Sequence, residues 1–247
     1  MNKILTLVLL SALSLYSQDI YATFDVKASK EATLAFTAGG TVTSVKVDIG
    51  SKVKKGDLLA TLEDEEQLAI LRLAQNDAIN AKIQAEQSRN SYERHNKLKD
   101  IMDEEKFEKI AFATKMADVN AKKTSRNVEL RKAQLEKTKL RAPFSGVITA
   151  KYKEVGDAVS GMQPEAFFQI MNISSVKLII EFDEKYASAV RVGDSFIYNL
   201  DGIKKNYTAK ISKIYPTINS KTRKISAEII TKNLMPGLFG HGIIKAK

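Results

Sequence analysis

The chain has 247 residues, no cysteine, and a formal charge of +10 from 39 basic and 29 acidic side chains. The lack of cysteine excludes disulfides, thiol catalysis and thiolate metal sites. A basic chain of this kind could bind nucleic acid, but the export signal described next argues against nucleic acid as a partner.

Residues 1–22 are predicted to be a cleavable signal peptide. Lys3 forms a short basic region, an apolar run follows from Ile4 to Leu15, and small and polar residues lead to Ala22. About a dozen apolar residues fall short of the ~20 that a membrane-spanning helix needs, so cleavage is favoured over a membrane anchor. Cleavage is expected at Ala22, with Ser17 as the alternative.

A glycine-punctuated pattern of alternating apolar and polar residues occurs twice. In residues 34–63 it leads from Gly40 to Gly50, and in residues 140–173 it leads with the same spacing from Gly146 to Gly156. Each copy predicts short strands with turns at the glycines. One small β-module is therefore expected to be divided into two halves.

The insert between the two halves, residues 64–139, is predicted to form two long helices. It is rich in Ala, Glu, Lys, Gln and Arg and contains no glycine or proline. The break is expected between Lys99 and Asp103, because Asp103 and the acids after it are typical of a helix N-terminus. A three-four spacing predicts an antiparallel coiled-coil seam, formed by Leu71, Ala74, Ala78, Ala81, Ala85, Ser88 and Tyr92 with Phe107, Ile110, Thr114, Ala117, Ala121, Thr124, Val128 and Leu135.

The last segment, residues 174–247, again favours strands, among them Val176–Asp183 and Thr222–Ile230. Basic residues outnumber acidic ones here more than elsewhere in the chain. This excess fits an anionic membrane surface or an acidic protein partner, although ordinary solvation of a small β-domain explains it equally well.

In this order the segments resemble the periplasmic adaptors, also called HlyD-like membrane fusion proteins, of bacterial tripartite efflux pumps. The resemblance implies a mixed, elongated, multi-domain fold: a lipoyl-like β-sandwich split by an antiparallel α-helical coiled-coil hairpin, plus a small β-barrel over 174–247. A leading strand, 23–33, would join the barrel. Because the chain stops soon after Gly237, it is similar to a short form without the membrane-proximal domain.

The resemblance also implies the function. The expected role is a periplasmic adaptor subunit that links an inner-membrane transporter to a TolC-type outer-membrane channel. The transporter is expected to be of the resistance-nodulation-division type, with an ATP-driven pump as the alternative. Self-association into a ring, expected to be a hexamer, follows from the same resemblance, and so does an inner-membrane association through the partner.

Two residues near the break between the helices, Arg94 and Leu98, match the spacing with which the family docks its channel, and Asp103 is the third candidate, in a tip about two residues shorter than in the family. The family often has a serine where Asp103 stands. If the resemblance holds, Arg94 and Leu98 would contact the mouth of the channel. Structurally, Asp103 could equally be a helix cap and Arg94 a solvated charge.

Two other functions are weighed against the adaptor. A biotin- or lipoate-carrying subunit needs a lysine at the turn between the two halves, but Glu63-Asp64-Glu65-Glu66 stands there. A periplasmic small-molecule or metal-binding module needs clustered ligands, whereas His95 and His241 are far apart and the methionines are scattered. We therefore expect no catalytic, cofactor-binding or metal-binding residues and no enzymatic activity.

Overall fold

The computed structural model describes residues 18–202 and 205–246. It divides into two units: the first contains the described residues up to Glu31 together with those from Met171 onward, and the second contains Ala32–Ile170. Most of the predicted signal peptide lies outside the described residues. Residues 18–22, its last part, already belong to a strand.

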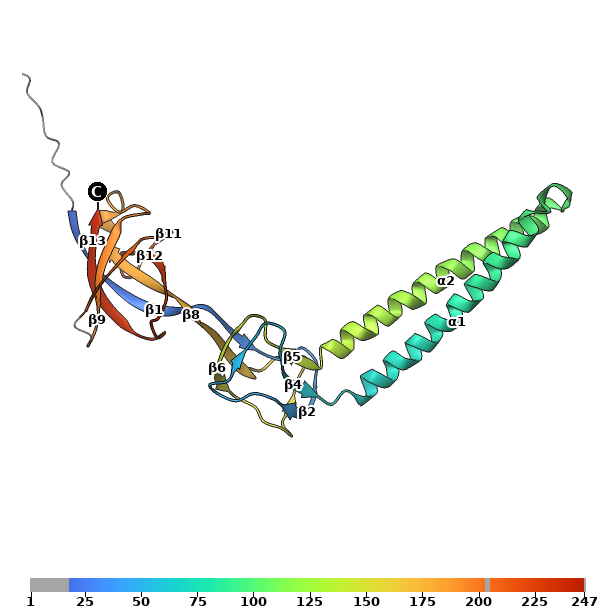
Figure 1. Cartoon of the computed structure of the whole chain (residues 1–247), viewed down its shortest axis with the longest axis horizontal. Helices are drawn as coiled ribbons and strands as arrows, with labels where there is room; N and C mark the ends of the chain where they lie inside the picture. Colours follow the sequence, from blue (N-terminus) through green and yellow to red (C-terminus); the bar gives the residue numbers. More distant parts are fainter. Residues whose placement is uncertain (1–17, 203–204, 247) are drawn as a thin grey trace, which may run out of the picture. The chain divides into compact units, whose positions relative to one another are not determined.

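The first unit is a curved sheet with the strand order β10-β9-β13-β1-β8-β12-β11 (Figure 1). Alternating residues point into its core, as the pattern of β9 shows, where Phe196, Tyr198 and Leu200 are buried. The strands are β1 (Gln18–Leu34), β8 (Phe168–Asp183), β9 (Ser195–Leu200), β10 (Asn206–Lys210), β11 (Lys213–Asn219), β12 (Lys224–Thr231) and β13 (Phe239–Ala246).

The start of β1 differs from the predicted leading strand, which was expected to begin at residue 23. Ile20 and Ala22 are fully buried, and β1 pairs with β13 from Gln18, which lies opposite Ala246. Ile20 and Ala22, which lie before the expected start of the strand, therefore belong to the core of the first unit.

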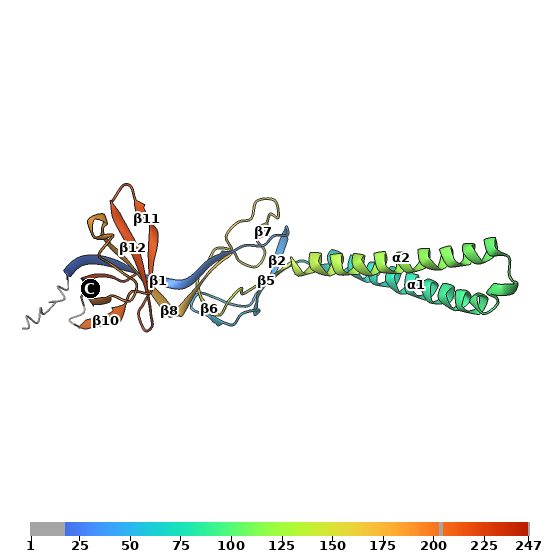
Figure 2. The ribbon, with the colours of Figure 1, turned by 90° about the horizontal axis from the view of Figure 1, so that it is seen from above.

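The second unit contains a small β-sandwich built from both halves of the sequence repeat (Figure 2). Its core includes Leu59, Ile148 and Phe168, none of which is exposed to solvent. The sandwich strands are β2 (Gly40–Val45), β3 (Lys52–Val53), β4 (Leu58–Leu62), β5 (Lys139–Arg141), β6 (Gly146–Lys151) and β7 (Ala158–Val159).

The two halves bind each other reciprocally. The Gly50 amide donates to the Ile148 carbonyl, and the equivalent Gly156 amide donates to the Val42 carbonyl, at 2.8 and 2.9 Å. Likewise β3 pairs with β6 and β7 pairs with β2. Gly50 and Gly156 have φ values of 86° and 96°, which glycine adopts without the steric cost other residues have. The sequence repeat is thus a structural repeat in which neither half is complete alone.

Helices α1 (Glu65–Asn96) and α2 (Glu104–Glu136) leave the sandwich between β4 and β5 and run antiparallel, side by side (Figures 1 and 2). Every residue of the predicted seam is buried or half-buried, and Ala81 and Ala85 are the most enclosed near the middle of α1. The predicted contact positions between the helices are confirmed. In the described part of the chain, no helix is long and apolar enough to span a membrane.

Candidate partner-binding surfaces

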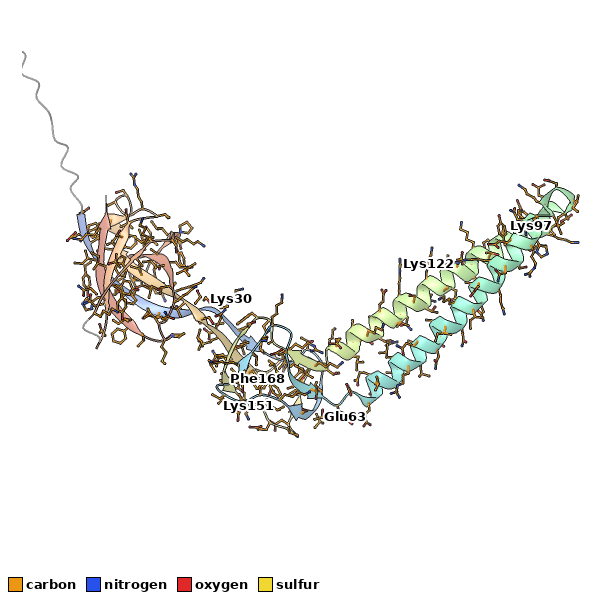
Figure 3. All side chains as sticks on the ribbon, in the orientation of Figure 1. Lys30, Glu63, Lys97, Lys122, Lys151 and Phe168 are labelled. Carbon is orange, nitrogen blue, oxygen red and sulfur yellow. The ribbon has the colours of Figure 1, made fainter. Side chains whose placement is uncertain are left out.

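The structure brings the three predicted docking residues together at the turn between α1 and α2. Arg94 lies in the last turn of α1, Leu98 precedes a short 3-10 turn over Lys99–Ile101, and Asp103 precedes α2. All three side chains are exposed. Lys97, labelled in Figure 3, marks this end of the hairpin. We call residues 94–103 the hairpin tip.

Asp103 has a clear structural role. Its Oδ1 accepts a hydrogen bond from the Lys106 amide at 3.0 Å, so it caps α2 as the sequence predicted. Glu104 and Glu105 follow in the first turn, where negative charge is favoured by the helix dipole. This cap fixes where α2 begins and therefore fixes the shape of the tip.

The tip presents apolar side chains to solvent. Leu98 is 50% exposed and Ile101 is 84% exposed, among basic neighbours that include Lys97 and Lys99. Ile101 was not among the predicted docking residues. Its apolar character within a polar turn was the available signal, but only the structure shows that nothing in the described chain covers it.

Two aromatic rings pack against each other between the helices, next to the tip. The rings of Tyr92 and Phe107 lie 5.5 Å apart across the two helices, and the Lys99 ammonium lies 5.9 Å from the Phe107 ring. His95 Nδ1 donates to the Ser91 carbonyl at 2.7 Å, a contact within its own helix. His95 is thus engaged locally and is not part of a ligand cluster.

An ion pair joins α1 and α2 further from the tip than these rings. The Arg89 guanidinium lies 2.8 Å from the Asp118 carboxylate, and this hydrogen bond raises the pKa of Arg89 above its ordinary value. Because Arg89 is largely exposed, the pair is expected to contribute little stability and mainly to fix the register of the helices.

The base of the hairpin is held by short contacts to the sandwich. The Leu62 amide donates to the Thr138 carbonyl at 2.8 Å, and the buried Thr138 hydroxyl donates to the Leu135 carbonyl at 2.7 Å. Only two residues, Glu63 and Asp64, separate β4 from α1. In a biotin or lipoate carrier, a turn at this place displays the lysine that is modified. Here the start of α1 replaces that turn, and no lysine stands in it.

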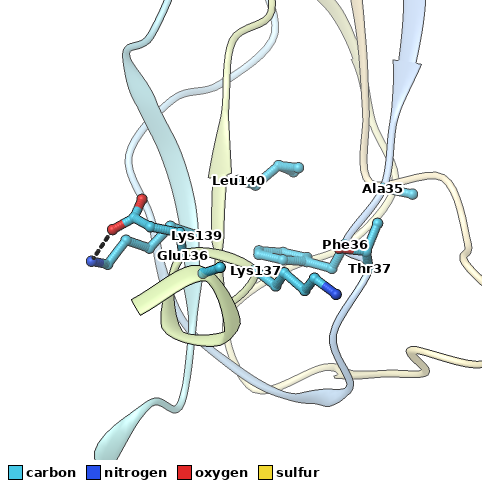
Figure 4. Close-up of a pocket in the computed structure, with 8 residues that line it drawn as sticks. Ala35, Phe36, Thr37, Glu136, Lys137, Lys139 and Leu140 are labelled. Atoms are coloured by element: carbon cyan, nitrogen blue, oxygen red, sulfur yellow. Dashed lines mark hydrogen bonds and ion pairs between the residues drawn. The ribbon is translucent and has the colours of Figure 1, made fainter. Parts of the chain in front are cut away.

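A shallow hollow of about 250 Å³ lies beside this base (Figure 4). Phe36 and Leu140 form part of its lining, and Glu136 is paired with Lys139 at 2.9 Å. The hydrogen bond from Lys139 holds the pKa of Glu136 below its usual value. The hollow is open and lacks convergent polar groups, so it is better understood as the junction of helix and strand than as a ligand site.

The sandwich carries one cluster of charges. Lys151 lies 2.7 Å from Glu154 and 3.2 Å from Asp48, two carboxylates that occupy equivalent positions in the two halves. These contacts, with Glu154 first, raise the pKa of Lys151. The Ile49 amide and then Lys151 lower the pKa of Asp48. The cluster joins the halves and, because its centre is a cation, does not suit a metal ion.

No metal site emerges elsewhere in the described residues. Within 18–202 and 205–246, no group of three or more His, Asp or Glu side chains could hold a metal ion. His241 lies 3.4 Å from Asp201 and stacks on Tyr21, with no further ligand beside it in this range.

Known proteins are similar to this chain in sequence and in fold. A family model described as the CzcB-like, barrel-sandwich hybrid domain matches residues 30–172. The cation efflux system protein CzcB of Alcaligenes sp. (strain CT14) is 26% identical over 211 residues, which make up 81% of this chain and 39% of that protein. The chain thus spans between 39% and 50% of the length of the curated relatives it matches.

Solved structures agree on the fold. A MacA–MexA chimera that contains the Pseudomonas aeruginosa MexA α-hairpin domain has a TM-score of 0.73 at 22% identity, covering 94% of this chain and 82% of that one. The membrane fusion protein Spr0693 from Streptococcus pneumoniae R6 has a TM-score of 0.73 at 15% identity, covering 92% and 99%. At these identities the likeness concerns the fold alone.

The family match also bears on whether the chain is an enzyme. Proteins of this adaptor family are structural linkers, so the prediction that the chain is not an enzyme is confirmed. The matched region contains both halves of the sandwich and the whole hairpin. The chain therefore belongs to the family of membrane fusion proteins with a CzcB-like barrel-sandwich hybrid domain.

Proposed function

We propose that this protein is a periplasmic adaptor subunit of a tripartite efflux system. It would link an inner-membrane transporter of the resistance-nodulation-division type to a TolC-type outer-membrane channel. The observation that carries the proposal is the hairpin tip, where Leu98 and Ile101 stand exposed beside Arg94. Exposed apolar side chains among charges are typical of a protein-binding surface.

The helices support such a role mechanically. Small residues in the seam, such as Ala81 and Ala85, allow the helices to approach closely, and we propose that they pack as a coiled coil. The exported substrate is proposed to be a cation, because the relative CzcB is described as part of a cation efflux system. No site in the described chain needs to bind that substrate for an adaptor to work.

Self-association into a ring, proposed as a hexamer, would complete the assembly. A single tip offers only a few side chains to a partner, so one tip is expected to bind weakly. Several tips held in one ring bind together, and their combined affinity can exceed that of one tip by orders of magnitude.

The test is co-purification of the exported protein with the outer-membrane channel of the same cell. Leu98→Ala and Arg94→Asp are expected to lower the captured channel at least tenfold. Val155→Ala, an exposed apolar truncation in the sandwich, and Arg72→Asp, the same charge reversal near the base of α1, serve as matched controls.

Equal loss in tip and control variants would contradict the assignment of the tip, provided that circular dichroism shows all four variants folded. Failure of the unmodified protein to capture any channel would contradict the adaptor proposal. The alternative, a periplasmic small-molecule or metal-binding module, would then require a stoichiometric ligand on the purified protein.

A further inference from the structure

The outer face of the sheet in the first unit carries exposed aromatic rings on two neighbouring strands, β1 and β13 (Figure 1). Side chains alternate along both strands, so that one set enters the core and the other set faces solvent. Tyr21, Phe239 and His241 belong to the second set, and all three are more than half exposed. We call these three residues the aromatic platform.

The register of the strands gives the platform a regular geometry. Tyr21 lies opposite Ile243, and Phe239 lies opposite Asp25, which is four residues further along β1. At the ~3.3 Å rise of a strand residue, the two rings are therefore about 13 Å apart along the sheet. His241 lies between them on β13 and stacks on Tyr21, with ring centroids 6.1 Å apart. The platform is thus extended, and strands rather than loops hold it in place.

A row of polar side chains crosses the platform. Thr23 lies opposite His241, and His241 lies opposite Asn199 on β9, which in turn lies opposite Asn206 on β10. The Asn199 amide donates to the side-chain carbonyl of Asn206 at 2.8 Å. The amide group of Asn206 and the side-chain carbonyl of Asn199 therefore keep hydrogen-bonding capacity at this face.

The platform ends at a hollow of about 490 Å³ that lies within the same unit. Asp25, the neighbour of Phe239, lines this hollow, and so does Lys27, which follows on the same side of β1. In the part of the chain that the structure describes, neither of these two charged side chains has a hydrogen-bond or ion-pair partner. A hollow of this volume lies within the range of small-ligand sites.

The charges near the platform are few and of both signs. Asp25 and Asp201 are negative, and Lys27 is positive. Such a face lacks the excess of basic side chains that an anionic membrane or a nucleic acid requires. Its rings alternate with polar groups, whereas the centre of a stable protein interface is largely apolar. The face therefore suits a ligand that is neutral, rich in hydroxyl groups and partly apolar.

We propose that the aromatic platform and the adjoining hollow bind an oligosaccharide, and that this ligand is a glycan chain of the cell wall. One face of a sugar ring consists of C–H groups, which are attracted to the negative face of an aromatic ring. The sugar hydroxyls both donate and accept hydrogen bonds, which suits the Asn206 amide and the Asp25 carboxylate. Tyr21 and Phe239 stack on two different sugars, because they are too far apart for one.

The site shares no residue with the hairpin tip. Outer strand faces of small β-barrels bind oligosaccharides in other folds, of which the OB-fold is an example. In the proposed periplasmic location, the contact would hold the adaptor at the cell wall. Glycan binding goes beyond the proposed function, and it is tested without the transporter or the channel.

Binding of a hexamer of N-acetylglucosamine to the purified protein, measured by NMR of the ligand, tests the site. Tyr21→Ala and Phe239→Ala are each expected to weaken binding at least fivefold. Tyr21→Phe, which keeps the ring, should bind within twofold of the unmodified protein. Tyr152→Ala and Phe112→Ala, which remove exposed rings from the sandwich and from α2, are matched controls and should bind as the unmodified protein does.

Sedimentation with purified cell-wall sacculi tests the source of the glycan. The unmodified protein is expected to sediment with the sacculi, and an excess of the hexamer should release it. Tyr21→Ala and Phe239→Ala should each lower the sedimented fraction at least threefold. With vesicles of phosphatidylglycerol, the same two changes should make no difference, because a lipid surface would attract the basic side chains elsewhere in the protein.

Several results would overturn the proposal. These are no binding of the hexamer, equal binding by platform and control variants that circular dichroism shows to be folded, and vesicle binding that depends on the platform. Hexamer binding without sedimentation would refute the cell wall as the source. An exported protein that begins at Thr23 would also overturn the proposal, because Tyr21 would be absent. Channel capture that depends on the hairpin tip while no glycan binds would leave the adaptor proposal intact and refute this site alone.

Discussion

The start of β1 makes a prediction about the mature protein. Cleavage after Ala22 would remove Gln18 to Ala22, which pair with β13, whereas cleavage after Ser17 would leave the strand whole. Ile20 is completely buried and Ala22 is 1% exposed. We predict that the exported chain begins at Gln18, and that a chain beginning at Thr23 is much less stable.

The magnitude follows from the buried side chains. Burial of an isoleucine side chain contributes about 1.5–3 kcal/mol, and the methyl group of Ala22 adds about 0.8 kcal/mol. The exposed ion pair between Asp19 and Lys245, at 2.6 Å, adds at most about 1 kcal/mol. The shorter chain should thus lose about 3 kcal/mol of the roughly 5–15 kcal/mol that stabilise a domain.

Thermal unfolding by circular dichroism measures this loss. Each kcal/mol shifts the Tm of a domain near 100 residues by about 4 °C or more, so the chain beginning at Thr23 should unfold at least ~12 °C lower. Asp19→Ala in the longer chain is the control, since it removes only the ion pair. Equal Tm values for the two chains, or an exported protein whose mass corresponds to Thr23, would refute this reasoning.

Three further perturbations test the packing. Ala85→Leu places a large side chain at the most buried position of the seam and should cost about 1–3 kcal/mol by overpacking, seen as a lower Tm; an unchanged Tm would mean that the helices are not in close contact at this position. Gly240→Ala should destabilise the first unit by more than about 2 kcal/mol in urea, because its Cβ would overlap the Asn199 carbonyl oxygen; a neutral effect would contradict the β9–β13 register. Lys151→Met should lower the Tm at pH 7, and the difference should shrink and then vanish as the pH falls through the folded-state pKa of Asp48, which the Ile49 amide and then Lys151 hold below its ordinary value of 3.8, because the stabilisation is lost when this carboxylate is protonated; a difference that persists at low pH would exclude a role for this ion pair.

Much of the second unit could be predicted from the sequence because its signals are periodic. The glycine repeat identified two halves, and the reciprocal bonds of Gly50 and Gly156 are the structural form of that repeat. The three-four spacing identified the seam, because burial between two helices depends mainly on the period of a pattern. Asp103 was identified as a cap from local chemistry alone.

Features that depend on distant partners were missed. The buried alternation of Ile20, Ala22 and Phe24 is a strand signal, but it overlaps a region that composition assigned to a signal peptide. Glu228 is 7% exposed because Tyr215 and Lys177, from two other strands, contact it. Nothing in the sequence near Glu228 indicates these neighbours.

The adaptor role is tested most directly by photo-cross-linking in living cells. A photoreactive amino acid at position 101, where Ile101 is 84% exposed at the hairpin tip, is compared with one at Val155 in the sandwich. The adaptor proposal predicts an adduct with an outer-membrane channel from position 101 and none from position 155. The same adducts from both positions, or no channel adduct from the tip, would contradict it.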